Sequence, residues 1–196
     1  ADADGAEIAR EYGVAHVIER LTRKNFEPVL DRYLAGGGFL LNNEMDDFAA
    51  KPGTPNMFGL VQGETDAIQP GKRPLSSMTP TIVLKDGKLF MTAGAPGGSR
   101  ISTAVLQVIL NVIDFGMNVQ DAIDAPRFHH QWLPNQIQIE AGRFSPETTN
   151  RLQQIGHKIT EVDRIGEAMG ITIDPKTNER LGAADPRSPD GKAVGY

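Results

Sequence analysis

The stretch Thr81-Ile-Val-Leu-Lys-Asp86-Gly87-Lys88-Leu-Phe-Met-Thr-Ala93 contains two apolar, β-prone runs joined by an Asp-Gly pair. Asp-Gly accepts positive φ at both central positions of a type I′ turn, so the stretch predicts a β-hairpin. Polar loops flank the hairpin on both sides, at residues 72–80 and 94–100. Because the strands of a hairpin run antiparallel, both loops are expected at the same end of it.

These two loops offer hydrogen-bond donors. Ser76 and Ser77 carry hydroxyls at the entrance of the hairpin, and Gly97 and Gly98 leave bare backbone N–H groups at its exit. A helix is expected directly after them, with Ser99 as its N-cap. Donors that converge on one point suit a carboxylate or an oxyanion, so the pattern predicts an anion-binding site. The alternative is that both loops are ordinary turns beside a hairpin.

Composition is typical of a soluble, globular chain. The chain has 196 residues, of which 39% are hydrophobic and 23% charged, enough for one domain with a substantial core. A formal net charge of −5 argues against a nucleic-acid partner or an anionic-membrane surface. The absence of cysteine excludes disulfides and thiolate chemistry. No apolar run approaches the ~18 residues of a membrane span and no signal peptide is visible, so we expect no membrane insertion by this chain.

Residues 1–36 differ in character from the rest. Apolar residues at spacings of three and four predict an amphipathic helix over about residues 5–24. A short second helix is expected after Asn25, ended by a run of three glycines. Nothing in this segment indicates chemistry. The chain is therefore interpreted as a helical N-terminal segment of unknown role, 1–36, followed by a domain at 37–196.

The segment Asn42-Asn43-Glu44-Met45-Asp46-Asp47-Phe48 sets two amides and three carboxylates among apolar residues. One interpretation is a solvated acidic turn. The other is a held segment, anchored by Met45 and Phe48, in which a carboxylate such as Asp47 binds an ammonium group through charge-assisted hydrogen bonds. The glycine- and proline-rich stretch 51–71 is expected to form a long ordered surface loop, and loops of this kind often act as lids.

The second half of the chain predicts an α+β architecture. A long helix over 99–115 is apolar on most sides, a shorter helix covers about 119–125, and Ser145 is expected to cap a third. Strands and helices in this order indicate a mostly antiparallel sheet packed on helices, and a four-layer sandwich would need a second sheet from a partner. The expected strands lie at 136–140, 158–162, 169–173 and 180–184.

The segment Arg127-Phe-His129-His130-Gln-Trp132 raises the question of a metal site or a catalytic histidine. Adjacent residues of a strand point to opposite faces, and no second ligand is suitably spaced, so we expect no metal here. Packing of the histidines with Trp132 is the preferred interpretation. Arg127 could pair with a carboxylate of the acidic turn.

Five segments carry a family resemblance: Leu40-Leu-Asn-Asn-Glu-Met-Asp-Asp-Phe48, Lys72-Arg-Pro-Leu-Ser-Ser-Met-Thr-Pro80, Gly97-Gly-Ser-Arg100, Ala125-Pro-Arg-Phe-His-His-Gln-Trp132 and Ala184-Asp-Pro-Arg-Ser188. Together they resemble the small subunit of γ-glutamyltransferase (γ-glutamyltranspeptidase, glutathione hydrolase). The resemblance covers about residues 37–196, in the order and spacing of that family. Several long motifs in register make it specific.

The resemblance implies an N-terminal-nucleophile hydrolase fold, an αββα sandwich completed by a large subunit cut from the same precursor. It implies that a γ-glutamyl group passes from glutathione or another γ-glutamyl compound to a threonine ester, and then to water, an amino acid or a peptide. No cofactor or metal is implied. The family is typically exported to the periplasm or the outer surface.

The resemblance also assigns site residues. The γ-glutamyl substrate would be bound through its α-amino group by acidic side chains and through its α-carboxylate by hydroxyls, and backbone N–H groups would form the oxyanion hole. The substrate-binding residues are Asn43, Glu44, Asp47, Ser76 and Ser77, with Glu44 and Asp47 on the α-amino group, and the catalytic oxyanion hole is Gly97 and Gly98.

The N-terminal segment departs from the family pattern. The family's small subunit begins with its nucleophilic threonine, whereas this sequence begins Ala1-Asp2-Ala3-Asp4, and Thr22 lies within a predicted helix. The nucleophile is therefore unknown. Three hypotheses follow: a γ-glutamyltransferase small subunit whose N-terminal segment is altered, misassigned or foreign; a catalytically silent γ-glutamyl-binding domain; or a related acylase or poly-γ-glutamate-cleaving enzyme. The first is preferred.

Overall fold

A computed structural model describes residues 44–56, 58–188 and 191–195. The expected N-terminal helices, the amide Asn43 and the residues before it lie outside the described residues. The described residues form two compact units: the first contains 44–56 and 61–76, and the second contains 58–60, 77–188 and 191–195.

The first unit consists mainly of loops and short 3-10 turns. Its turns are η1 (Glu44–Asp47) and η2 (Glu64–Asp66). A parallel bridge between Ala49 and Ala67 joins the segments that contain these turns. The described residues of the stretch 51–71, which are 51–56 and 58–71, thus form a loop with η2 inside it, as expected from its glycines and prolines. Its action as a lid stays a prediction.

The hairpin is confirmed. Strands β1 (Thr81–Lys85) and β2 (Lys88–Gly94) are antiparallel. Asp86 and Gly87 connect them with φ of 52° and 73°, the two positive angles of a type I′ turn. Thr81 pairs with Ala93, so the segments before β1 and after β2 leave the hairpin at the same end.

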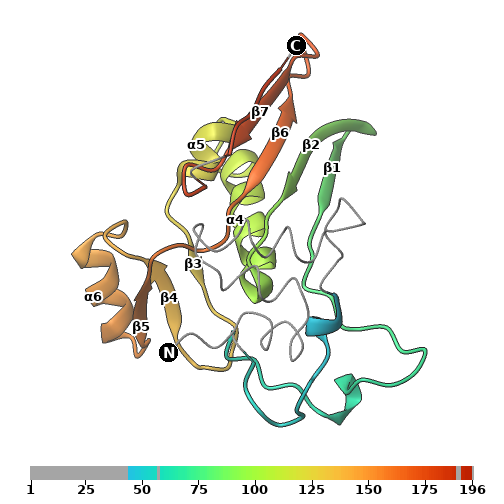
Figure 1. Ribbon diagram of the computed structural model, residues 1–196. Helices are drawn as coiled ribbons and strands as arrows, with labels where there is room; N and C mark the ends of the chain where they lie inside the picture. The colour runs from blue at the N-terminus through green and yellow to red at the C-terminus, as the bar shows by residue number, and fades with distance from the viewer. Residues whose placement is uncertain (1–43, 57, 189–190, 196) are drawn as a thin grey trace, which may run out of the picture. The chain divides into compact units, whose positions relative to one another are not determined.

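The hairpin belongs to a four-stranded antiparallel sheet in the order β1-β2-β6-β7, with β6 at Met169–Ile173 and β7 at Arg180–Ala184. Two helices, α4 (Ile101–Ile113) and α5 (Val119–Asp124), pack on one face of this sheet (Figure 1). Side chains of β2, α4 and α5 form the core of the unit. The buried members are Met91, Ala93, Ile101, Val105, Val108, Val119, Ala122, Ile123, Ala168 and Ala183.

The opposite face of the same sheet is apolar and exposed within the described residues. Ile82 and Leu84 of β1 are 71% and 61% exposed, and Met169 and Ile171 of β6 are 53% and 44% exposed. Each alternates along its strand with residues that face the helices, as the two-residue period of a strand requires. We call this surface the outer sheet face.

A second sheet has the order β3-β4-β5, with β3 at Phe128–His129, β4 at Ile137–Glu140 and β5 at Ile159–Val162. Strands β4 and β5 are parallel, and α6 (Pro146–Gln154) is the crossover between them. The N-cap of α6 is confirmed, because the Ser145 hydroxyl accepts the Thr148 N–H at 3.1 Å. The expected α+β class holds, with one parallel pair of strands among antiparallel ones.

Candidate functional site

The segment from Pro96 to Ser99, called the glycine loop here, follows β2 and leads into α4. Gly97 has φ 141° and Gly98 has φ 58°, both in the region that side chains rarely adopt. A Cβ on Gly98 would overlap the Phe58 ring, at 2.5 Å from Cε1, and a Cβ on Gly97 would lie 3.1 Å from Gly166 Cα. Both positions therefore require glycine.

The backbone N–H groups of this loop are available as donors. Within the described part of the chain, no hydrogen bond is donated by the N–H of Gly97 or Gly98; the loop is closed instead by the Arg100 N–H, which donates to the Gly97 carbonyl at 3.2 Å. A pair of adjacent amides without internal acceptors can stabilise an anionic oxygen. The expected N–H donors at the hairpin exit are thus present.

The expected N-cap at Ser99 is wrong. The chain enters α4 through a 3-10 turn, η3 (Gly98–Arg100), and Arg100 occupies the N-cap position of α4 without a side-chain cap. The Ser99 hydroxyl donates instead to Gln131 Oε1 at 2.8 Å. A tertiary partner has replaced the local capping bond that the sequence suggested.

Gly166 supports the glycine loop from the side of Gly97. It has φ 67°, and a Cβ there would lie 3.2 Å from both the Pro96 carbonyl oxygen and Ala104 Cβ. The nearby Arg164 carbonyl accepts from Arg100 Nη1 at 3.3 Å. No local signal in the sequence indicates this contact, because a single glycine in a loop rarely shows what it packs against.

Ser76 and Ser77 lie just before β1. Ser76 is exposed and belongs to the first unit, whereas Ser77 is half-buried and belongs to the second. The Ser77 carbonyl accepts from Thr79 Oγ1 at 3.1 Å, which fixes the approach to the strand. Ser77 and the glycine loop therefore leave the hairpin at the same end, as expected from the register of β1 and β2.

Only one of the two residues expected to anchor the acidic turn, the segment 42–48, is buried. Phe48 is buried, whereas Met45 is 61% exposed, so the expectation for Met45 is wrong. Asp47 is half-buried, and its carbonyl accepts from Gln62 Nε2 at 3.0 Å. Gln62 also donates to Asp66 Oδ2 at 2.7 Å, which ties η1 to η2. Asp47 and Ser76 thus belong to the first unit, and the glycine loop to the second.

The two histidines behave differently. His129 is buried and His130 is exposed, in agreement with their expected opposite orientations. The prediction that the histidines pack against Trp132 is wrong, because the Trp132 side chain is 77% exposed. The Trp132 backbone has φ 69°. His129 instead lies between polar partners, with Nδ1 2.7 Å from Thr103 Oγ1 and Nε2 2.8 Å from Gln131 Oε1.

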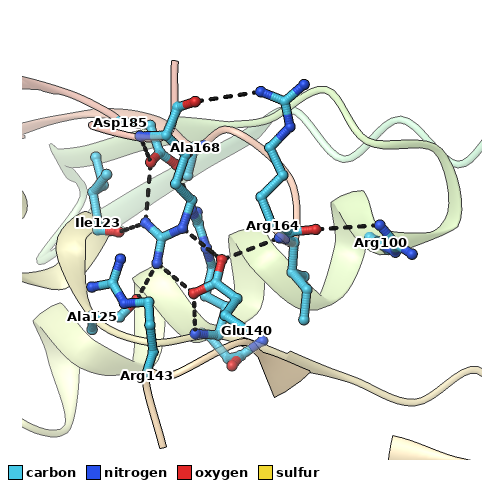
Figure 2. A network of polar contacts seen from close by, with 12 residues as sticks. Arg100, Ile123, Ala125, Glu140, Arg143, Arg164, Ala168 and Asp185 are labelled. Carbon is cyan, nitrogen blue, oxygen red and sulfur yellow. Dashed lines mark hydrogen bonds and ion pairs between the residues drawn. The ribbon is translucent and has the colours of Figure 1, made fainter. Parts of the chain in front are cut away.

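Among the described residues, the ion-pair partners of Arg127 lie outside the acidic turn. This arginine forms part of a buried ion cluster with Glu140, Asp185 and Arg187. Figure 2 shows the two carboxylates of this cluster, Glu140 and Asp185, within a network of polar contacts. Arg187 donates to Glu140 Oε1 through Nε at 2.5 Å and to Oε2 through Nη2 at 2.6 Å, and Arg127 Nη2 donates to Asp185 Oδ2. Two cations and two anions therefore neutralise one another in a buried site.

The cluster binds backbone as well as side chains. Glu140 Oε1 accepts the Ile165 N–H at 3.1 Å, and Asp185 Oδ2 accepts the Ala168 N–H at 2.6 Å. These two amides flank Gly166, so the carboxylates hold the loop that packs on Gly97. The cluster thereby connects the end of β4 and the end of β7 to the support of the glycine loop.

Burial alone would raise the pKa of Glu140. Hydrogen bonds from Arg187 and from the backbone N–H groups of Arg127 and Ile165 outweigh burial and hold the pKa of Glu140 below its usual value. Asp185 follows the same pattern: burial opposes its charge, but the Arg127 and Arg187 bonds hold its pKa low. Burial lowers the pKa of His129 below its ordinary value, which favours the neutral imidazole at neutral pH.

No metal centre is found in the part of the chain that the structure describes, since it contains no group of three or more His, Asp or Glu side chains placed to hold an ion. None of its helices has the length and hydropathy of a membrane span.

These features define a class of protein: an α+β domain in which a glycine loop leads into a helix, with two backbone amides that have no acceptor among the described residues. Comparison with known proteins specifies the family. A family model described as gamma-glutamyltranspeptidase matches residues 32–195. The glutathione hydrolase proenzyme of Escherichia coli K12 is 54% identical over 159 residues, covering 81% of this chain and 27% of that protein.

Two further comparisons extend this result. A glutathione hydrolase proenzyme of Pseudomonas aeruginosa is 39% identical over 99% of this chain, an alignment that takes in the N-terminal segment, and over 33% of its own length. The crystal structure of a mutant Helicobacter pylori gamma-glutamyltranspeptidase superposes with a TM-score of 0.73 at 52% identity, covering 78% of this chain and 83% of that one. The chain belongs to the γ-glutamyltranspeptidase family. It spans about a third or less of the length of these proenzymes.

Proposed function

We propose that this chain is the small-subunit part of a γ-glutamyltransferase that transfers a γ-glutamyl group to water, an amino acid or a peptide. Glutathione and other γ-glutamyl compounds would be its donors. The observation that carries the proposal is the glycine loop, in which Gly97 and Gly98 exclude a Cβ and leave two N–H groups without an acceptor among the described residues.

The glycine loop fits the chemistry of acyl transfer. When a nucleophile attacks the γ-carbonyl of the donor, the carbonyl oxygen becomes negatively charged, and two preorganised amides stabilise that charge more in the transition state than in the bound substrate. Collapse of the tetrahedral intermediate expels the donor's amine and leaves a γ-glutamyl ester, which an acceptor then cleaves. The ester would form on a threonine, the residue type that the family resemblance implies.

Two sets of side chains are proposed to recognise the substrate, one at its α-ammonium group and one at its α-carboxylate. The half-buried carboxylate of Asp47, with Glu44, would hold the α-ammonium group, because charge-assisted bonds gain strength in a partly dry site, and Asn43 would be a further substrate-binding residue. The hydroxyls of Ser76 and Ser77 would donate to the α-carboxylate. Such a pair of contacts recognises glutamate by its charges and leaves the γ-carbonyl as the reacting group.

A large subunit is the proposed partner. The outer sheet face exposes Ile82, Leu84, Met169 and Ile171, an apolar surface that a monomer would not favour in water. A second sheet packed on it would complete an αββα sandwich of the N-terminal-nucleophile type. Because the chain spans 27% of the E. coli relative, a proenzyme of that length has ample residues to supply the sheet.

The division of the chain is proposed from the character of its sequence, and the location of the protein from the family resemblance. Residues 1–36 would be a separate segment preceding a small-subunit domain at 37–196. The assembled enzyme would act in the periplasm or outside the cell.

The test is turnover by this chain assembled with its large subunit. Release of glutamate from glutathione, faster in the presence of an amino-acid acceptor, is the expected result. Binding of glutamate without turnover would replace the proposal with a silent γ-glutamyl-binding domain. Cleavage of poly-γ-glutamate or of an acylated amine in preference to glutathione would replace it with the related acylase activity.

A further inference from the structure

A line of polar side chains runs from the glycine loop into α4 and β3, and catalysis as described above does not use it. Ser99 donates to Gln131 Oε1 at 2.8 Å, and His129 Nε2 lies 2.8 Å from the same oxygen. On its other side, His129 Nδ1 lies 2.7 Å from Thr103 Oγ1. Gln131 is therefore the residue that joins the loop to the buried histidine.

The amide of Gln131 has one consistent orientation. Its Nε2 atom donates to the carbonyls of Phe58 at 2.9 Å and Leu133 at 3.1 Å, so the nitrogen must face these two acceptors. Its Oε1 atom then accepts from Ser99 and from His129 Nε2. With Nε2–H donating to Gln131, Nδ1 of a neutral imidazole is an acceptor, and the Thr103 hydroxyl has two acceptors in reach, this nitrogen at 2.7 Å and the Arg100 carbonyl at 3.1 Å. Every donor in the line meets an acceptor.

Gln131 restrains Gly98 indirectly, through two hydrogen-bonded neighbours. Through Ser99 it holds the residue that follows Gly98 in the chain. Through the Phe58 carbonyl it holds the residue whose ring occupies the space where a Gly98 side chain would be. The amides that would face the oxyanion are thus fixed by a side chain that touches neither of them.

We propose that Gln131 is a positioning residue that fixes the N–H groups of Gly97 and Gly98 in the geometry of the oxyanion hole. The inference rests on the proposed function, because it takes the glycine loop as the oxyanion hole. A residue of this kind acts on the charge that develops in the transition state, and it leaves the contacts to the substrate's α-amino and α-carboxylate groups alone. Its loss should lower kcat and leave KM nearly unchanged.

The chain offers a matched control at Gln107. Like Gln131, this half-buried glutamine bridges backbone groups: it donates to the carbonyls of Thr103 and Phe128 at 2.7 and 2.8 Å and accepts the Phe128 N–H at 3.0 Å. None of these bonds reaches the glycine loop. Replacing each glutamine by methionine keeps most of the volume and removes the hydrogen bonds in both cases.

The experiment measures kcat and KM of the assembled enzyme with a chromogenic γ-glutamyl anilide. Gln131→Met should lower kcat between about tenfold and about a hundredfold, the range expected for a misplaced catalytic group, with KM within about twofold. Gln107→Met should leave kcat within about twofold. Ser99→Ala should reduce kcat in the wild type and have little further effect in the Gln131→Met background, because the serine acts through the glutamine.

Equal losses of kcat in the two methionine variants would overturn the proposal, as would an unchanged kcat in Gln131→Met. If Gln131→Met fails to assemble, Ser99→Ala decides: an unchanged kcat would overturn it. Wild-type protein without turnover would overturn the proposed function instead. Hydrogen exchange at the Arg100 amide, which donates to the Gly97 carbonyl and closes the loop, then tests the positioning itself: faster exchange in Gln131→Met than in Gln107→Met supports it, and equal rates overturn it.

Discussion

Arg187 donates to both carboxylate oxygens of Glu140, through Nε at 2.5 Å and Nη2 at 2.6 Å. The same guanidinium donates to the backbone carbonyls of Ile123 and Ala125 at 3.0 and 2.9 Å. One side chain near the end of the chain therefore ties the end of α5 to the end of β4. Because Glu140 also holds the loop around Gly166, this pair connects the stability of the fold with the geometry of the glycine loop.

Glu140→Gln should destabilise the protein strongly. The substitution leaves two buried guanidinium groups opposite a single carboxylate, and loss of one partner of a buried ion pair costs about 3–5 kcal/mol. The free energy of unfolding in denaturant measures the loss. Glu161→Gln on the exposed side of β5 is the control, expected within about 0.5 kcal/mol of the wild type. A Glu140→Gln variant as stable as this control would contradict the role of the cluster.

Stability should fall in acid because of the same carboxylates. The folded pKa values of Glu140 and Asp185 lie below their ordinary values of 4.5 and 3.8. A depressed folded pKa means that the unfolded chain binds protons first, so this stabilisation is complete above the ordinary values and is lost as pH falls toward the folded pKa. Unfolding free energies measured from neutral pH downward should decrease below about 4.5.

The control for acid sensitivity is Glu140→Gln itself, which lacks one of the two titrating groups. Its stability should depend less steeply on pH below about 4.5 than that of the wild type. Equal slopes in both proteins would mean that other carboxylates cause the acid sensitivity.

Gly98→Ala should abolish most of the activity. An added Cβ collides with the Phe58 ring, so the loop must shift and its amides leave the oxyanion position. Loss of one oxyanion donor costs about 10²–10³ in kcat. Gly116→Ala is a matched control, since Gly116 has φ 66° and an added Cβ would meet no atom within 4 Å. That variant should lose about 1–2 kcal/mol of stability and keep its kcat. Similar kcat values for both variants would contradict the assigned role.

Asp47→Asn should raise KM for a γ-glutamyl donor between about tenfold and about a hundredfold, because the ammonium group loses a charged partner worth about 1.5–3 kcal/mol. Initial-rate measurements over a range of donor concentrations give the value. Glu64→Gln, in η2 of the same unit, should leave KM unchanged. An Asp47→Asn enzyme with wild-type KM would refute the assignment.

Local patterns predict most of the second unit. The Asp86-Gly87 turn, the cap at Ser145 and the strands at 169–173 and 180–184 appear where the sequence indicates them. Each of these depends on residues close together in the chain, so the physical cause is visible in a short window of sequence.

Long-range partners are the source of the errors. Ser99 has the composition of an N-cap, but a tertiary contact with Gln131, 32 residues away, takes its hydroxyl. The sequence leaves a carboxylate of the acidic turn as one possible partner of Arg127, yet its partner Asp185 is 58 residues downstream. The hydrophobic periodicity of a sequence does not indicate contacts between residues so far apart in the chain. The motif around Asp185 carries the family resemblance, and only the structure shows that its charges are buried.

The most direct test of γ-glutamyl transfer is intact-mass measurement of the assembled enzyme after rapid mixing with glutathione. A γ-glutamyl ester that forms on a threonine and disappears as glutamate is released is the predicted result, with much slower formation in Gly98→Ala than in Gly116→Ala. Absence of both the adduct and free glutamate in the wild type would contradict the claim that this chain carries the γ-glutamyl transfer site.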